Sequence, residues 1–325
     1  MTPAKGNSLR LAAVSILVSL TVALALGEGI VRLKNADMET YDIEMWRYSN
    51  TLKKRSEDPA LGHEHVPSSS AILQKVEIRT NREGLRGPEL PPPRPGQRRI
   101  LFLGSSITLG WGVPENQVLT SLVADRFHAD GQDVVVINGG IGNYNSTRYV
   151  ELFMTKLKAT EPTDIVIQYF VNDAEVLDAG GGNFLLRNSE LAVTLWIAFN
   201  RYFAKTGETS LIEHYRAIYD HNTAGYQAMV GALGRLADYA KAHGIRVYLA
   251  MTPDVHNLVN YKLGFIDDDM EKISARLGFT FVDFLPVLSG TPPQQIWATP
   301  GDPHPNAFGH RLMADALYPV LKAPR

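Results

Sequence analysis

The chain has 325 residues, of which 45% are hydrophobic and 20% are charged, so it is long enough for one large hydrophobic core. Its formal net charge is −2, with basic and acidic residues spread along the chain, which argues against a nucleic-acid-binding protein. It contains no cysteine, which excludes disulfides, thiolate catalysis and cysteine metal sites.

Residues 1–34 are expected to form an N-terminal signal anchor helix. Leu11 to Gly27 carries no charge, and at about 1.5 Å per residue this run is near the lower limit for crossing a bilayer. Cleavage at "ALA", Ala23 to Ala25, would instead release a secreted protein, and a buried core helix is a third alternative. The apolar pattern continues through Ile30 and Leu33, which favours an uncleaved anchor with the rest of the chain on the periplasmic side.

Residues 35–98 are expected to be a linker and accessory segment. They mix charges, tyrosines and small polar residues, and they end in the proline-rich stretch "GPELPPPRPGQRR". Prolines at this density favour extended backbone and forbid a continuous helix. The main domain is therefore placed at 99–325.

Within the main domain, strand-length apolar runs alternate with segments of helical periodicity. Since strands that alternate with helices indicate a parallel sheet covered on both faces, we expect a three-layer α/β/α fold with a mostly parallel sheet. The expected strands are 100–103, 134–137, 165–170, 245–251 and 279–284, and the helical periods are 118–127, 149–157, 226–237 and 308–317.

Polar residues cluster where these strands end. In parallel sheets, sites lie outside the carboxyl ends of the strands, so loops that leave these ends are expected to meet. The clusters are Gly104-Ser105-Ser106, "NGGIGNYNS" from Asn138, the pair Asn172 and Asp173, and "GDPHPNAFGH" from Gly301 to His310 in the last loop.

These loops contain the parts of a nucleophilic serine site. Ser105 or Ser106 is the candidate nucleophile, His304 the base, and Asp302 the group that orients the His304 ring. Backbone N–H groups around Gly140 and the Asn172 amide are candidate oxyanion donors. Each element alone has a simpler explanation as a helix cap or a tight turn, but four such loops at one edge of a sheet favour chemistry.

Three common motifs are missing from the chain. Thr108 occupies the place where the G-x-S-x-G elbow of α/β-hydrolases needs its second glycine. The sequence also lacks GxxxxGK[ST], and "LGSSITLG" does not have the G-x-G-x-x-G spacing. P-loop nucleotidases and dinucleotide-binding enzymes are therefore disfavoured.

Over residues 76–320 the sequence resembles the SGNH hydrolase family, also called GDSL-type esterases. Gly104-Ser105-Ser106 resembles its first block with serine in place of aspartate, and "NGGIGNYNS" resembles the second. "FVND" resembles the third with Phe170 in place of glycine, and "GDPHPN" resembles the last with Asp302 two residues before His304 instead of three. The N-terminal "GEGIVRL" and "RTNREGLRGPE" are similar to segments of membrane-anchored bacterial members.

The resemblance implies a flavodoxin-like SGNH fold and a serine esterase that hydrolyses acyl or acetyl esters of a glycan, a lipid or a small molecule. It implies Ser106 as nucleophile, because the residue after the strand-ending glycine supports the turn while the next can point outward. The implied oxyanion donors are Ser106, Gly140 and Asn172, and no metal or cofactor is expected. Candidate substrate-binding residues are Ser105, Asn143, Tyr144 and Asp173.

Two alternatives remain open for the function of this site. The same residues are able to transfer an acetyl group to a polysaccharide, which would make the protein an O-acetyltransferase. A degenerate site would only bind a glycan.

An insertion is expected at about 174–221. Its most apolar part, "LAVTLWIAFNRYF" from Leu191 to Phe203, has helical spacing. The leading interpretation is a helix packed on the core, and the alternative is a lid or a wall that contacts the acyl group.

Overall fold

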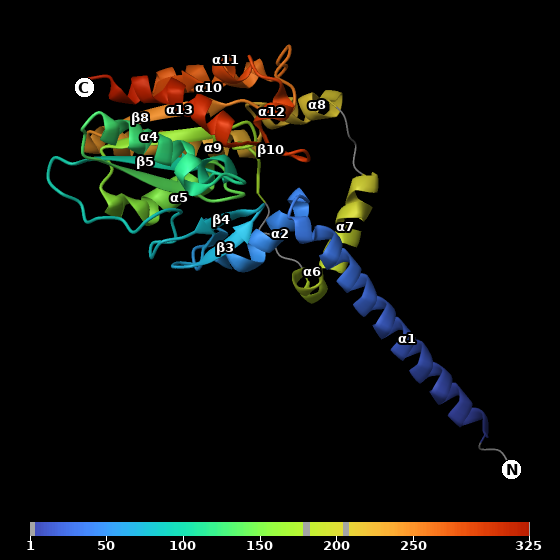
Figure 1. Ribbon diagram of the computed structural model, residues 1–325. Coiled ribbons are helices and arrows are strands. Elements are labelled where there is room, and N and C mark those ends of the chain that lie inside the picture. Colours follow the sequence, from blue (N-terminus) through green and yellow to red (C-terminus); the bar gives the residue numbers. More distant parts are fainter. Residues whose placement is uncertain (1–3, 178–182, 204–207, 325) are drawn as a thin grey trace. The chain divides into compact units, whose positions relative to one another are not determined.

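The computed structural model describes residues 4–177, 183–203 and 208–324 (Figure 1). The chain divides into two compact units. Unit 1 comprises Met1–Trp46 and Gly181–Ala204, and unit 2 comprises Arg47–Gly180 and Lys205–Arg325. Parts of the expected insertion, residues 178–182 and 204–207, lie outside the described residues.

Unit 2 is built on a five-stranded sheet in which all neighbouring strands are parallel. The strand order is β6-β5-β7-β8-β9, so the chain starts near one edge and works outward on both sides. The expected parallel sheet is confirmed, and each expected strand overlaps an observed one. The strands are β5 (Arg98–Gly104), β6 (Val134–Gly140), β7 (Asp164–Phe170), β8 (Arg246–Thr252) and β9 (Thr280–Asp283).

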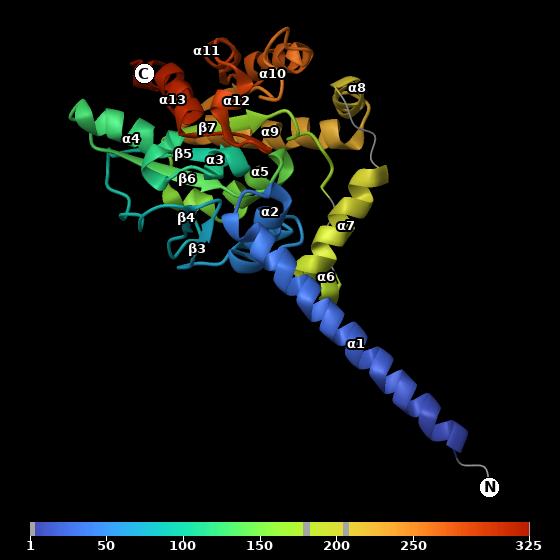
Figure 2. The same cartoon turned by 45° about the vertical axis from the view of Figure 1, so that its right-hand side comes forward.

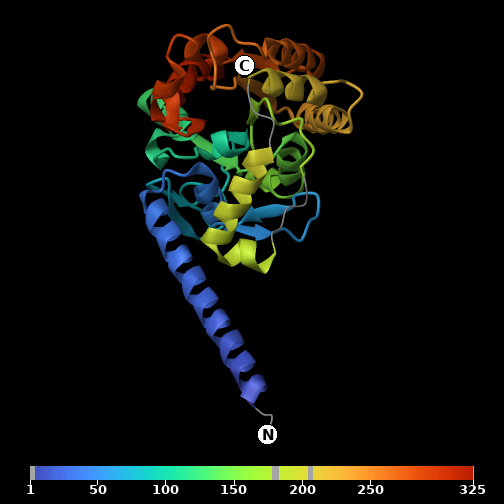
Figure 3. The same cartoon turned by 90° about the vertical axis from the view of Figure 1, so that its right-hand side faces the viewer.

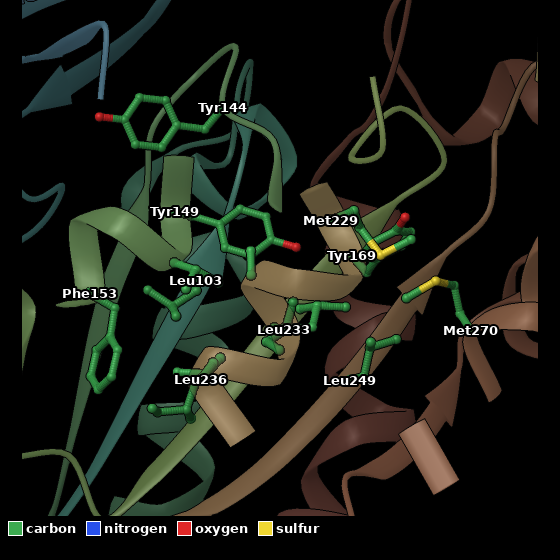
Figure 4. Packing of buried hydrophobic residues seen from close by; sticks show 14 of the residues in the cluster. Leu103, Tyr144, Tyr149, Phe153, Tyr169, Met229, Leu233, Leu236, Leu249 and Met270 are labelled. Atoms are coloured by element: carbon green, nitrogen blue, oxygen red, sulfur yellow. The ribbon is translucent and has the colours of Figure 1, made fainter. Parts of the chain in front are cut away.

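Helices cover both faces of this sheet. Side chains along each strand point alternately to the two faces, and each face has its own hydrophobic cluster. Leu101 and Leu103 face one cluster, while Ile100 and Phe102 face the other. Figure 4 shows Leu103 and Leu249 of the first cluster against side chains of the covering helices. That cluster includes α5 (Ser146–Thr155), α9 (Ala224–His243) and α10 (Gly264–Leu277), and the second includes α4 (Leu119–Ala129), α11 (Leu285–Leu288) and α13 (Ala307–Lys322).

Shorter elements complete unit 2. Two hairpins precede the sheet: β1 (Lys53–Arg55) with β2 (His63–His65), and β3 (Ser70–Leu73) with β4 (Val76–Arg79), the latter labelled in Figure 2. A third hairpin, β10 (Trp297–Thr299) with β11 (Asp302–Pro305), follows the sheet. The other elements are α3 (Ser106–Leu109), η2 (Glu115–Gln117), η3 (Leu157–Thr160), α8 (Glu208–Ile218) and α12 (Pro293–Ile296).

The β3–β4 turn and the segment after it reach the loops that follow α3. The turn consists of Gln74 and Lys75, both with positive φ, at 46° and 65°. Further along, the buried Arg86 donates hydrogen bonds to the carbonyls of Leu109, Gly110 and Val113 at 2.7–2.8 Å. The region expected to be a linker and accessory segment therefore holds the chain beside α3 in place.

Unit 1 contains α1 (Ala4–Lys34), η1 (Asn35–Asp37), most of α2 (Tyr41–Thr51), α6 (Phe184–Asn188) and α7 (Glu190–Phe203). The helical stretch Leu9–Asp37 is long and apolar enough to cross a membrane. Leu191 to Phe203 form the helix α7, as the apolar spacing predicted; α7 belongs to unit 1, and most of its large apolar side chains are exposed within that unit. Its buried residues are Glu190 and Val193.

A close approach between β6 and α3 explains the glycine at position 140. A Cβ atom at Gly140 would lie 2.2 Å from the Leu109 nitrogen and 2.6 Å from the Thr108 carbonyl carbon. Real Cβ atoms do not come this close to backbone, so only glycine lets α3 sit on the end of β6. Ser106, the first residue of α3, is positioned by this contact.

We predict that Gly140→Ala lowers the free energy of unfolding by about 1–3 kcal/mol, because α3 has to move to make room for the methyl group. Gly231→Ala in α9 is the matched control, since a Cβ there meets no atom within 4 Å. That substitution removes a helix-interior glycine and is expected to stabilise by about 0.5–1 kcal/mol. Thermal unfolding followed by circular dichroism measures both, and equal midpoints for Gly140→Ala and wild type would contradict the packing argument.

Candidate active site

The structure brings Ser106 and His304 together across 198 positions of sequence. Ser106 opens α3 directly after β5, and His304 lies in β11. The Ser106 Oγ is 2.8 Å from the His304 Nε2, which is hydrogen-bond distance. Ser106 remains partly accessible to solvent, as a group that meets a substrate must be.

Asp302 holds the other side of the His304 ring. Its Oδ1 accepts hydrogen bonds from the His304 Nδ1 at 2.6 Å and from the His304 backbone N–H at 3.1 Å. The two-residue offset therefore forms a tight turn in which Pro303 does not prevent contact. Burial favours a raised Asp302 pKa, but the hydrogen bonds and charge of His304 together with Gln74 lower the pKa below its ordinary value. Asp302 is thus a buried, ionised acceptor.

Two residues that the sequence motifs did not indicate complete the environment of Asp302. The Asp302 Oδ2 accepts hydrogen bonds from the Trp111 Nε1 at 2.9 Å and from the Gln74 Nε2. Gln74 comes from the β3–β4 turn, and Trp111 comes from the loop after α3. Neither residue belongs to a family block. Both are buried, and only their hydrogen bonds to Asp302 in the folded protein identify them.

Asn172 follows β7 and fits the part of an oxyanion donor. Its Oδ1 is buried without a hydrogen-bond partner, and no bond from its amide nitrogen to another described residue is found. Asn172 is half-buried, and its Nδ2–H groups are the donors that would be available to an oxyanion, whereas its Oδ1 is an acceptor. The N–H of Ser106, at the first position of α3, is also without an acceptor among the described residues.

The backbone of residues 140–144 offers a different donor from the one expected. The Gly140 N–H already donates to the Asn138 Oδ1 at 3.0 Å. The N–H groups of Ile141, Gly142 and Tyr144 donate to the Gly104 carbonyl, the Tyr48 hydroxyl and the Ile141 carbonyl. Within the described part of the chain, Asn143 is the residue of this loop whose N–H has no protein acceptor; it is exposed, with φ of 63°.

Three of the expected substrate-binding residues support the loops instead. Tyr144, which Figure 4 labels, is 2% exposed, and its hydroxyl donates to the His63 carbonyl. Asp173 is buried; its Oδ2 accepts from the Phe170 N–H, and burial raises its pKa well above the ordinary value. Ser105 is 5% exposed at the N-cap of α3. Asn143 is the expected substrate-binding residue that lies exposed.

A second Asp-x-His pair follows β8. The His256 Nδ1 lies 2.8 Å from the Asp254 Oδ1, which also accepts the His256 backbone N–H at 2.9 Å. The hydrogen bond to Asp254 raises the pKa of His256 above its ordinary value, although partial burial opposes this. The turn is the same as at Asp302 and His304, so the serine at 2.8 Å is what distinguishes the His304 pair.

His310 serves the packing of α13 on α4. It is fully buried, its Nδ1 accepts the Leu119 N–H at 3.0 Å, and burial lowers its pKa to about 3. It is therefore neutral and structural. Among the described residues, no group of three or more His, Asp or Glu side chains is arranged as metal ligands would be.

Several solved structures of other proteins are similar to part of this chain. No curated protein matches the chain. Solved structures that are similar include TesA (19% identity, TM-score 0.46, 69% of this chain and 98% of that one). A second is the psychrotrophic esterase EstA from Pseudoalteromonas sp. (18% identity, TM-score 0.44, 69% of this chain and 97% of that one). A third is a two-domain esterase active on acetylated mannans (20% identity, TM-score 0.45, 69% of this chain and 49% of that one).

A family model provides the assignment. The model of the GDSL-like Lipase/Acylhydrolase family matches residues 102–312, which is more than half of the chain. This match includes the loops that contain Ser106, Asn172 and His304. The chain therefore belongs to the GDSL-like lipase/acylhydrolase family and is a hydrolase that acts on ester bonds.

Proposed function

We propose that the protein is a serine esterase that hydrolyses acyl or acetyl esters through Ser106, His304 and Asp302. The observation that supports this most directly is the continuous hydrogen-bond chain of 2.8 Å from Ser106 to His304 and 2.6 Å from His304 to Asp302. A serine is a poor nucleophile unless a base accepts its proton, and a base works best when a third group orients it.

In this mechanism the Ser106 Oγ attacks the ester carbonyl while its proton moves to the His304 Nε2. The His304 imidazolium then donates that proton to the departing alcohol, which leaves an acyl group on Ser106. Water attacks the acyl group and gives a proton to the His304 Nε2, and His304 passes this proton to the Ser106 Oγ as the C–O bond to Ser106 breaks and the acid leaves. Asp302 keeps the Nδ1–H of His304 pointing at itself and stabilises the imidazolium.

The oxyanion that forms in each step needs donors that are free before the substrate binds. We assign this part to the N–H groups of Ser106 and Asn143 and to the Asn172 amide, because none of the three has a protein acceptor among the described residues. The Gly140 N–H, an expected donor, is engaged by Asn138 and contributes through packing instead.

A degenerate glycan-binding site fits these observations less well. A site without selection for catalysis has no need for a buried carboxylate that accepts four hydrogen bonds and aligns a histidine with a serine. The ester hydrolysed is of the acyl or acetyl class.

We also propose that α1 anchors the protein in a membrane with unit 2 on the extracytoplasmic side. The window of α1 that is apolar enough to span has none of its residues buried within the protein. Lys5 and Arg10 precede the apolar run, which is the charge placement expected on the cytoplasmic side.

We predict that Ser106→Ala abolishes hydrolysis of p-nitrophenyl acetate and covalent labelling by a fluorophosphonate, because the attacking oxygen is lost. Ser105→Ala is the matched control; it should keep labelling and a substantial fraction of activity, since Ser105 is buried beside the nucleophile. Labelled peptides identified by mass spectrometry locate the adduct. A fluorophosphonate adduct on Ser105, or one that persists in Ser106→Ala, would disprove the assignment.

We predict that Asn172→Ala lowers kcat by about 10²–10³ with little change in KM, because one oxyanion donor contributes roughly 2.7–4 kcal/mol in the transition state. The melting temperature should stay near that of wild type, because the Asn172 amide has no protein partner among the described residues. Steady-state kinetics with the same substrate provide the measurement, and an unchanged kcat would exclude Asn172 from the mechanism.

We predict that Asp302→Asn lowers kcat by roughly three to four orders of magnitude, because the uncharged amide no longer fixes the His304 tautomer. Asp254→Asn is the matched control: it alters an Asp-x-His pair of the same geometry that has no serine partner, and should leave kcat nearly unchanged. A loss smaller than about tenfold in a thermally stable Asp302→Asn protein would favour a Ser106–His304 dyad.

A further inference from the structure

The α7 helix presents an apolar stripe that no other described part of unit 1 covers. We define the α7 stripe as five side chains with exposed fractions between 53% and 84%: Leu195, Trp196, Phe199, Tyr202 and Phe203. They recur at intervals of three and four residues, so they share one face of the helix. The buried residues of α7, Glu190 and Val193, lie on the opposite face.

The opposite face of α7 is fixed to the candidate membrane helix. The Glu28 carboxylate of α1 accepts hydrogen bonds from the Glu190 and Leu191 N–H groups and from the Ser189 hydroxyl at 2.8–3.0 Å. It thereby caps the first turn of α7. The Asn35 Nδ2 also donates to the Glu190 Oε1 at 2.9 Å in a buried contact.

Two further contacts hold the rest of the α6–α7 hairpin, which Figure 3 shows in yellow. The Trp46 Nε1 donates to the Leu186 carbonyl at 2.7 Å, and Arg201 forms an ion pair with Asp42. The hairpin is therefore attached at both ends to the segment that follows the apolar run of α1. Its position relative to a membrane is set by α1.

The position of Glu28 along α1 indicates the depth in the membrane at which α7 begins. Glu28, Arg32 and Lys34 are the first charges after the apolar run, and charges of this kind mark where a helix leaves the hydrocarbon core. Glu28 binds the start of α7, so α7 begins at the headgroup level. With 14 residues, or about 21 Å, α7 is too short to span a bilayer.

The composition of the stripe matches this level. Tryptophan and tyrosine are enriched where a membrane meets water, because their rings are apolar and their polar tips reach headgroups and water. The stripe has no charged side chain, and α6 adds Phe184 and Leu185, which are 77% and 62% exposed. Contiguous apolar surface of this extent is unusual on a protein that only water surrounds.

From these contacts and this composition, we infer that the α6–α7 hairpin is a second membrane-binding element, with the α7 stripe embedded in the headgroup interface of the bilayer that α1 spans. This inference rests on the proposed anchoring by α1. It assigns a lipid surface, and not the acyl group of a substrate, as the partner of Leu191 to Phe203. The hairpin then prevents rotation of unit 1 about the α1 axis.

The absence of native cysteine permits a direct test on the full chain. Single-cysteine proteins are labelled with the fluorophore NBD and reconstituted into phosphatidylethanolamine–phosphatidylglycerol vesicles that contain lipids with a nitroxide near the headgroup. The stripe is probed by Phe199→Cys and, independently, by Trp196→Cys. Leu17→Cys reports whether α1 is in the bilayer, and Lys241→Cys on the exposed side of α9 is the aqueous control.

We expect nitroxide quenching at Phe199→Cys and Trp196→Cys to exceed that at Lys241→Cys by about threefold or more, as an interfacial helix requires. Blue-shifted emission at Leu17→Cys with water-like, unquenched emission at both stripe positions would overturn the inference while leaving the anchor intact. Blue-shifted but unquenched emission at the stripe positions would also overturn the inference, because protein and not lipid would then cover the α7 stripe. Self-quenching between labelled molecules in that case would show that the covering protein is a second copy of this chain. Water-like emission from the Leu17→Cys label would overturn the anchor and this inference together.

Discussion

The arrangement of the site depends on one buried carboxylate. Asp302 has no exposed surface, so its charge is tolerated only because both oxygens are hydrogen-bonded. The donors come from three distant segments: the β3–β4 turn with Gln74, the loop after α3 with Trp111, and His304 itself. The contacts that satisfy this charge therefore also assemble the proposed catalytic residues, and the segment before the sheet takes part in them through Gln74.

A second constraint is steric: the ends of two strands have to leave room for α3. Gly104 and Gly140 end neighbouring strands, and a Cβ at either position would meet α3 at 2.1–2.2 Å. The missing side chains let α3 start directly over the strand ends, which brings the Ser106 hydroxyl to the edge where His304 arrives. Arg86 fixes the other end of α3 through three carbonyls. Ser106, the proposed nucleophile, thus lies on a short helix held at both ends.

Sequence reasoning was most successful where physical signals are local. Alternating apolar runs predicted the sheet, and polar strand ends predicted which loops meet, because parallel strands align their carboxyl ends. It could not find Gln74 and Trp111, since ordinary residues become donors to Asp302 only through tertiary contact. It named Gly140 where Asn143 has the free N–H, because an Asn138 side-chain bond is invisible in a motif. It predicted the α7 helix, but apolar periodicity alone does not say whether protein or lipid covers the apolar face of a helix.

The β3–β4 turn shows what this arrangement costs the fold. A two-residue hairpin turn with positive φ at both positions favours Asn-Gly, and side chains such as Gln74 and Lys75 are strained there by roughly 1–2 kcal/mol each. The strain persists because Gln74 reaches Asp302 from this position. Engineering for thermostability would choose Asn-Gly at the turn, and would take a donor away from the carboxylate that orients His304. At this hairpin, greater stability and efficient catalysis call for different residues.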